Sequence, residues 1–191
     1  MKLLPTELPG VVIVEPALFG DERGWFMESW NGARFEAALR ELGLPAAGDF
    51  VQDNHSCSKA GVLRGLHYQL PPHPQGKLVR VVRGAAFDVA VDIRRASPHF
   101  GRWIGVELTA ANRCQLWIPP GFAHGFLALE DETHFLYKTT GAYARDCERA
   151  IRWDDAAIGI AWQLQRIGVT PLVAAKDAAA PLLAAAEVFE R

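Results

Sequence analysis

Cysteine is scarce in this chain of 191 residues, and its three copies, Cys57, Cys114 and Cys147, are widely spaced. An odd number without a CxxC pair indicates neither a disulfide framework nor a zinc knuckle, and it fits a reducing compartment. No uninterrupted apolar run approaches the ~20 residues that span a bilayer. The N-terminus, MKLLPTELPG, is broken by two prolines and lacks the apolar core of a signal peptide. We therefore expect a soluble, cytoplasmic protein.

An excess of charge of one sign is also missing. The chain has 20 Lys and Arg against 22 Asp and Glu, a net charge of -2. Without a basic face or tail, nucleic acid and membrane surfaces are poor candidates as partners. Half of the residues are hydrophobic (50%), which is enough for one domain with a substantial core over residues 1–191.

Short β-type runs dominate the middle of the chain, and Gly, Pro, Asn or Asp punctuates the gaps between them. This spacing predicts a mainly β fold, an antiparallel β-barrel of jelly-roll type. The central runs are 62–69, 77–82, 86–93, 103–108, 114–118 and 125–129. Further strands are expected at 11–14, 25–30, 50–55 and 133–140.

A few helices are expected at the periphery of the barrel. Asn31 can cap a helix over 31–42, whose apolar residues repeat at helical spacing and which Gly43 closes. A closing helix is predicted over 178–189, beginning at Pro181 or just before it.

The segment 62–84, VLRGLHYQLPPHPQGKLVRVVRG, places Arg64, His67 and Lys77 on two strand-like runs joined by a proline-rich loop. Such a group suits a site that binds an anionic ligand and moves protons on it. The alternative is a basic hairpin with a loop histidine. In a regular strand Arg64 and His67 point to opposite faces. Because a glycine inside a strand often marks a bulge, we predict that Gly65 turns both side chains inward; otherwise only one of them lines the barrel.

A metal site is the first functional hypothesis to test. Metal-binding barrels of this kind offer an early HxH, then a carboxylate, and a third histidine from a PxGxxH segment. The segment from Pro120 to His124 matches the late part, but Tyr68 and Gln69 follow His67, so HxH is absent. Two histidines without a placed carboxylate make a poor site for zinc or iron, and we expect no metal.

Proton chemistry without a metal is the second hypothesis. His67 can act as a base whose tautomer a carboxylate fixes. The candidates for that carboxylate are Asp177, Asp88 and Asp92. Lys77 could stabilise an oxyanion, and Tyr137 could return a proton from another direction. The alternatives are a core tyrosine and a solvated lysine. Phosphate oxygens could be bound by Arg23, Arg64, Lys176 and Arg80, and a base could stack on Trp25, Phe26 or Tyr143.

Ten motifs along the chain resemble, in order, the dTDP-4-dehydrorhamnose 3,5-epimerases. They are GDERGWF, FVQDNHS, VLRGLHYQ, QGKLVRV, FDVAVDIR, SPHFGRW, QLWIPPGFAHGF, FLYKTT, IRWDD and AKDAAAPLL, from about Pro5 to Leu183. The resemblance implies a cupin-type jelly roll without metal or organic cofactor that acts on a dTDP-linked 4-keto-6-deoxy sugar. It also implies a homodimer with shared strands, in which N-terminal residues of one subunit complete the neighbour's site.

The resemblance also implies roles for individual residues. His67 matches the base that removes the protons next to the C4 carbonyl, and Asp177 matches its partner. Tyr137 matches the acid that protonates C5, and Lys77 matches the residue that stabilises the enolate at the C4 oxygen. Substrate-contacting positions are Arg23, Glu28, Gln52, Asn54, Arg64, His124, Glu148 and Lys176.

One stretch departs from the family pattern. Many members have an aromatic pair after the YK motif, whereas this chain has Gly141-Ala142-Tyr143, which bears on its strictness for thymidine. The leading hypothesis is the double epimerase. The alternatives are a single-centre epimerase or ketoisomerase of a deoxysugar pathway, a metal-dependent cupin oxygenase and a non-catalytic sugar-nucleotide binder.

Overall fold

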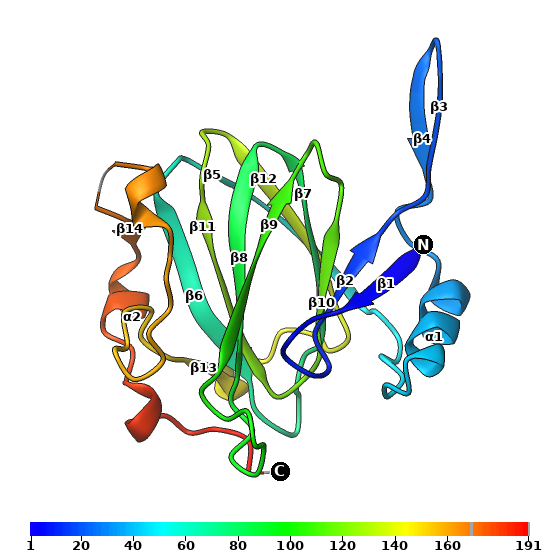
Figure 1. Ribbon diagram of the computed structural model, residues 1–191. Helices are drawn as coiled ribbons and strands as arrows, with labels where there is room; N and C mark the ends of the chain where they lie inside the picture. Colours follow the sequence, from blue (N-terminus) through cyan, green and yellow to red (C-terminus); the bar gives the residue numbers. More distant parts are fainter. Residues whose placement is uncertain (169, 191) are drawn as a thin grey trace.

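Two sheets of mostly antiparallel strands pack face to face in the computed structural model, which describes residues 1–168 and 170–190 (Figure 1). The first sheet has the order β1 (Lys2–Pro5), β2 (Val12–Glu15), β10 (Gln115–Ile118), β7 (Lys77–Arg83), β12 (Thr133–Thr139) and β5 (Gln52–Ser58). The second has the order β13 (Glu148–Ala150), β6 (Val62–Gln69), β11 (Phe122–Ala128), β8 (Ala85–Asp92) and β9 (Trp103–Thr109). The sheets do not close into a complete barrel, but the predicted jelly-roll class is confirmed.

Strand β8 explains where the interior has room for a site. All eight of its residues are buried, so both of its faces are covered. One face carries large side chains, Phe87 and Val89 among them, which pack against the C-terminal segment. The other face points between the sheets and carries Ala86, Asp88 and Ala90. Small and polar side chains there leave the space between the sheets partly unfilled.

The predicted first helix is confirmed as α1 (Gly32–Glu41). The Asn31 side chain accepts a hydrogen bond from the backbone N–H of Arg34 at 3.1 Å, as an N-cap does. Phe35 and Leu39 are fully buried and pack with Trp117 on the outer face of the first sheet. The helix therefore covers one end of that face.

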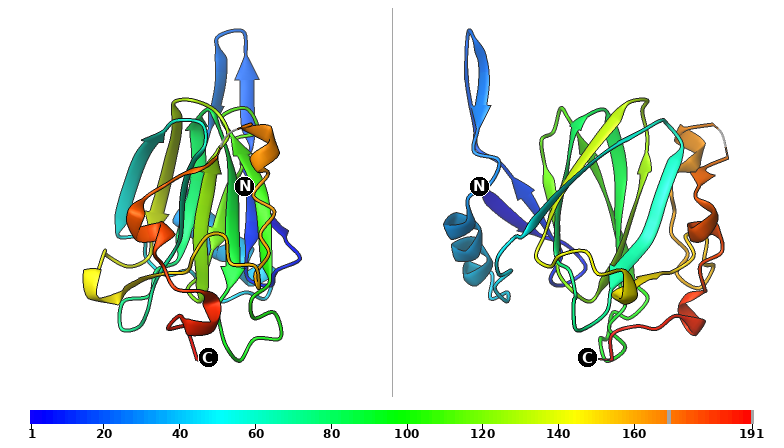
Figure 2. Two further views of the ribbon diagram at one scale, coloured as in Figure 1. Left: turned by 90° about the vertical axis from the view of Figure 1, so that its left-hand side faces the viewer. Right: turned by 180° about the vertical axis from the view of Figure 1, so that it is seen from behind.

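The predicted closing helix over 178–189 is wrong. The segment contains only the end of α2 (Ala175–Ala178) and a short 3-10 helix, η3 (Leu183–Ala185), and then runs extended until Phe189 bridges to Arg94. It buries Leu183 against the outer face of the second sheet. Burial along a sheet thus outweighs the helix propensity of its alanines. On the same side, β14 (Leu172–Val173) pairs in parallel with β6 (Figure 2).

A two-stranded hairpin, β3 (Leu18–Asp21) and β4 (Gly24–Met27), extends away from the sheets (Figures 1 and 2). The strand expected over 25–30 is therefore shorter than predicted. The apolar side chains of the hairpin are exposed to solvent, with Phe19 63% and Phe26 69% exposed. None of the described helices is long and apolar enough to cross a membrane.

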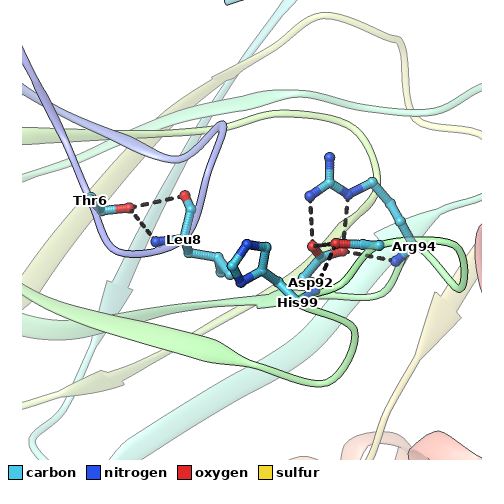
Figure 3. A network of polar contacts seen from close by, with 6 residues as sticks. Thr6, Leu8, Asp92, Arg94 and His99 are labelled. Carbon is cyan, nitrogen blue, oxygen red and sulfur yellow. Dashed lines mark hydrogen bonds and ion pairs between the residues drawn. The ribbon is translucent and has the colours of Figure 1, made fainter.

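Asp92, one of the three candidate partners of His67, is engaged elsewhere (Figure 3). Its carboxylate accepts hydrogen bonds from Arg94 Nε at 2.9 Å and from Ser97 Oγ at 2.6 Å. Ser97 Oγ in turn accepts the backbone N–H of His99 at 3.1 Å. The network holds the connection between β8 and β9, and Asp92 is excluded as the partner of the base.

Candidate active site

A cavity of about 330 Å³ opens between the two sheets. Strands β5, β7 and β12 of the first sheet and β6 and β13 of the second supply most of its wall. Its lining residues are Gln52, Asn54, His67, Tyr68, Gln69, Gln75, Lys77, Tyr137, Tyr143 and Glu148. Six of the twelve predicted site residues are among them. Three lining residues were not predicted from the sequence, Tyr68, Gln69 and Gln75, although the first two directly follow His67 on the same strand.

The bulge predicted at Gly65 is present. On β11, His124 and Phe126 are two residues apart, but their partners on β6, His67 and Arg64, are three apart. The extra residue on β6 places Arg64 and His67 on the same face of the sheet. Gly65 has a φ of +127°, and a Cβ there would lie 2.5 Å from the Cα of Gly125. Only glycine fits this close approach of two backbones.

His67 and Asp177 form a hydrogen-bonded pair, with His67 Nε2 2.7 Å from Asp177 Oδ1. The second carboxylate oxygen accepts the backbone N–H of Gly65 at 3.3 Å, so the bulge also fixes the carboxylate. Burial alone would raise the pKa of Asp177, but the hydrogen bonds from His67 and Gly65 outweigh it and lower that pKa. Because a carboxylate only accepts, Nε2 carries the proton and Nδ1 has the free lone pair of a base.

Lys77 enters the cavity from β7. Its Nζ donates to the backbone oxygen of His67 at 3.1 Å, across the space between the sheets. Burial lowers the pKa of Lys77 to about 8, against the attraction of Asp88 and Glu148. At neutral pH Lys77 is therefore still a cation, and it is desolvated. A desolvated cation stabilises an oxyanion strongly.

Tyr137 faces the cavity from β12, on the sheet opposite to that of His67. Burial raises the pKa of its phenol, and the nearby charge of Arg64 opposes this only in part. The hydroxyl is therefore protonated at neutral pH and can act as a proton donor.

A second histidine–carboxylate pair lies next to the first. His124 is the cross-strand neighbour of His67 on β11, and its Nε2 lies 2.7 Å from Asp88 Oδ1. Both side chains are buried, and Asp88 is 0% exposed. Asp88 is thus the partner of His124, not of His67, which leaves Asp177 as the correct choice among the three candidates.

The remaining predicted contact residues divide into two groups. At the edge of the cavity, Lys176 Nζ lies 3.6 Å from Glu148 Oε1. Arg64 is not among the lining residues, and it donates from Nε to Ser58 Oγ at 3.2 Å. Tyr143 donates from its hydroxyl to Glu148 Oε2 at 3.1 Å. The other group lies outside the cavity: Arg23 on the projecting hairpin, and Glu28, which pairs with Arg34 at the start of α1.

Among residues 1–168 and 170–190, no three His, Cys, Asp or Glu side chains are grouped as metal ligands. The expected absence of a metal stays a prediction, since this structure does not test it. What the two inward histidines do show is a carboxylate partner each, an arrangement that orients and polarises an imidazole.

A jelly roll with a histidine–carboxylate base, a buried lysine and an opposing tyrosine belongs to the class of proteins that remove and return protons on a bound ligand. Residues 5–185 match the family model described as dTDP-4-dehydrorhamnose 3,5-epimerase. The chain belongs to that family, and the predicted membership is confirmed.

Relatives and solved structures agree with this assignment. The dTDP-4-dehydrorhamnose 3,5-epimerase of Shigella flexneri is 56% identical over 93% of both chains. A Legionella pneumophila 3,5-epimerase, solved with dTDP-4-keto-L-rhamnose, is 44% identical with a TM-score of 0.90, over 100% of this chain and 98% of the other. A 3'-monoepimerase from Streptomyces bikiniensis, solved with dTDP-quinovose, is 34% identical with a TM-score of 0.84, over 96% of this chain and 88% of the other.

Proposed function

We propose that this site inverts C3 and C5 of dTDP-4-dehydro-6-deoxy-D-glucose to give dTDP-4-dehydro-L-rhamnose. The observation that carries the proposal is the placement of His67 and Tyr137 on opposite sheets, with the cavity between them. Inversion requires removal of a proton from one face of a carbon and delivery to the other face. A base and an acid on facing walls meet that requirement.

The reaction is redox-neutral, and each residue has one task in it. The hydrogens at C3 and C5 are acidic because the C4 ketone accepts the electron pair when a proton leaves. His67 Nδ1 takes the proton, and the ammonium of Lys77 stabilises the resulting enolate oxygen. Asp177 stabilises the imidazolium that forms. Protonation of the enolate from the opposite face completes each inversion. At C5 we assign the donor as Tyr137 and at C3 as water, and proton exchange with solvent restores His67 and Tyr137.

A single-centre epimerase is the second candidate, favoured by the likeness to the Streptomyces bikiniensis monoepimerase. The double epimerase is preferred because the relative with that name has the higher identity, 56% against 34%. The preference for thymidine rests on Tyr143 at the edge of the cavity, which offers one exposed ring for stacking on a base.

We further propose a homodimer in which the hairpin β3–β4 of one copy reaches the cavity of the other. Within its own chain the Arg23 side chain donates to Asp21, two residues away, and it is 85% exposed. Exposed apolar side chains on a projecting hairpin are typical of a surface that a partner covers. Strand β5 ends the first sheet and lines the cavity, so its edge can receive a further strand. Arg23 would then bind the diphosphate.

Proton NMR of the substrate in deuterated water tests the function directly. We expect deuterium to enter at C3 and C5 with the native protein and at neither with His67→Asn. The matched control is His55→Asn, because His55 is exposed and faces outward from the first sheet. Exchange at one carbon only would establish the single-centre epimerase. Binding of the sugar nucleotide without any exchange would contradict both enzymes and leave a binding protein.

A further inference from the structure

Asp88 is a buried carboxylate to which the proposed reaction gives no task. It lies between the sheets at 0% exposure, and only its Oδ1 is hydrogen-bonded, by His124. Its Oδ2 is buried without a hydrogen-bond partner in the described part of the chain. An unsatisfied carboxylate oxygen in an interior is costly, so its presence needs a reason.

The neighbouring charges supply that reason. The side chain of Asp88 faces the same interior as the ammonium of Lys77. Burial raises the pKa of Asp88, and the hydrogen bond from His124 and the positive charge of Lys77 act against that rise, while the charge of Asp88 in turn favours the ammonium of Lys77. The other titratable or charged groups facing this interior are His67, Arg64, His124, Tyr137 and Glu148. Of these, Glu148 also attracts Lys77, but it lies at the open edge, where solvent screens it.

We propose that Asp88 is a positioning residue of the epimerase site, which orients His124 through Oδ1 and keeps the ammonium of Lys77 charged for the enolate. Because a carboxylate only accepts, His124 Nε2 must carry the proton, and its Nδ1 is left free. His124 is the cross-strand neighbour of His67, so its orientation decides which polar atom lies beside the base. The two carboxylates thus have different roles: Asp177 orients the base His67, and Asp88 acts on His124 and Lys77, which lie on the side of the enolate oxygen.

Substitution Asp88→Asn separates charge from shape. The amide oxygen can still accept from His124 Nε2, so the imidazole keeps its orientation while the charge near Lys77 is lost. This inference rests on the proposed function, and we expect kcat to fall about twofold at pH 7 and up to about tenfold above pH 8, with a small change in KM. Burial lowers the pKa of Lys77, and without Asp88 that pKa falls further. The alkaline limb of the pH–rate profile should therefore move to lower pH by about one unit.

The matched control is Asp92→Asn on the same strand. Asp92 is equally buried, but it pairs with Arg94 and Ser97 instead of facing the cavity. We expect this variant to lower the melting temperature without moving the alkaline limb. If both variants leave the limb in place, or move it equally, the role of Asp88 is contradicted.

The native protein offers a test that needs no variant. Nitrogen-15 NMR of the imidazoles should show His124 protonated at Nε2 and still uncharged where an ordinary histidine becomes charged, because burial lowers its pKa more than Asp88 raises it. An Nδ1-protonated ring, or protonation near the ordinary pKa of ~6.5, would overturn the inference. This readout does not depend on turnover. If the protein had no epimerase activity, the proposed function would be contradicted, but the protonation state of His124 could still be measured.

Discussion

The cavity and the projecting hairpin carry predicted site residues in two different physical settings. In the cavity, strand register fixes the side chains, and the base and the lysine each have a partner: Asp177 accepts a hydrogen bond from His67, and the carbonyl of His67 accepts one from Lys77. On the hairpin, Arg23 extends into solvent beside exposed aromatic rings. Under the proposed function the groups for the chemistry come from one chain, whereas the proposed contact to the anionic end of the substrate comes from a second copy. Substitutions in the two regions should therefore fail in different ways.

Replacing Lys77 with methionine should separate activity from stability most clearly. We expect kcat to fall by roughly 10²- to 10³-fold, because a fixed charge at the developing oxyanion is lost. The free energy of unfolding should nevertheless rise, by up to about 3 kcal/mol, since burial has lowered the pKa of Lys77 to about 8 from 10.5.

The sign follows from proton linkage. Between about pH 8 and 10.4 the unfolded chain binds this proton and the folded chain does not, so native stability rises with pH across that window. The gain from methionine should therefore be full below pH 8 and vanish toward pH 10.4. Chemical denaturation at pH 7 and pH 10 measures it. A variant less stable than the native protein at pH 7 would show that the hydrogen bond to His67 outweighs the burial of charge.

Removing the phenol hydroxyl of Tyr137 should affect the reactions at C3 and C5 differently. With Tyr137→Phe we expect inversion at C5 to fall by about 10²-fold, while exchange at C3 through His67 persists. Deuterium incorporation followed at each carbon measures this difference. The matched control is Tyr143→Phe, which removes a hydroxyl at the edge of the cavity and should leave the ratio of C3 to C5 exchange unchanged. Equal loss at both carbons in Tyr137→Phe would remove the assigned role of this tyrosine.

The contrast between the regions also shows what sequence could and could not predict. Short β-type runs separated by Gly, Pro, Asn or Asp predicted most of the strands, and Gly65 predicted the bulge, because both depend on local backbone geometry. The pairing of Asp88 with His124 depends on which strands become neighbours, which no local pattern encodes. The closing helix was wrong because burial of Leu183 along a sheet outweighed local propensity. The single domain, the cytoplasmic location and the roles of the site residues stay predictions.

Arg23→Ala should produce the smallest loss of activity, and it bears most directly on the comparison between the cavity and the hairpin. If Arg23 binds the diphosphate, its loss should raise KM by about tenfold or more and change kcat little, because contacts to a remote group act mainly on binding. Sedimentation should still show a dimer, since the apolar side chains of the hairpin remain. Arg83→Ala, which removes an exposed arginine paired with Glu132 away from the cavity, is the matched arginine control.

Mixing the weakly binding Arg23→Ala variant with the inactive His67→Asn variant tests whether the hairpin serves its own cavity or a neighbour's. The Arg23→Ala variant lacks the arginine in every site, and it is assayed at low substrate. The His67→Asn variant lacks the base in every site. If the hairpin reaches across, a hybrid dimer holds one intact site, in which the His67→Asn subunit supplies Arg23 to the partner's complete base. After full subunit exchange at equal amounts, about a quarter of all sites should recover. If each hairpin folds back onto its own chain, neither site of the hybrid is complete and no activity returns, so recovery itself decides which chain Arg23 serves.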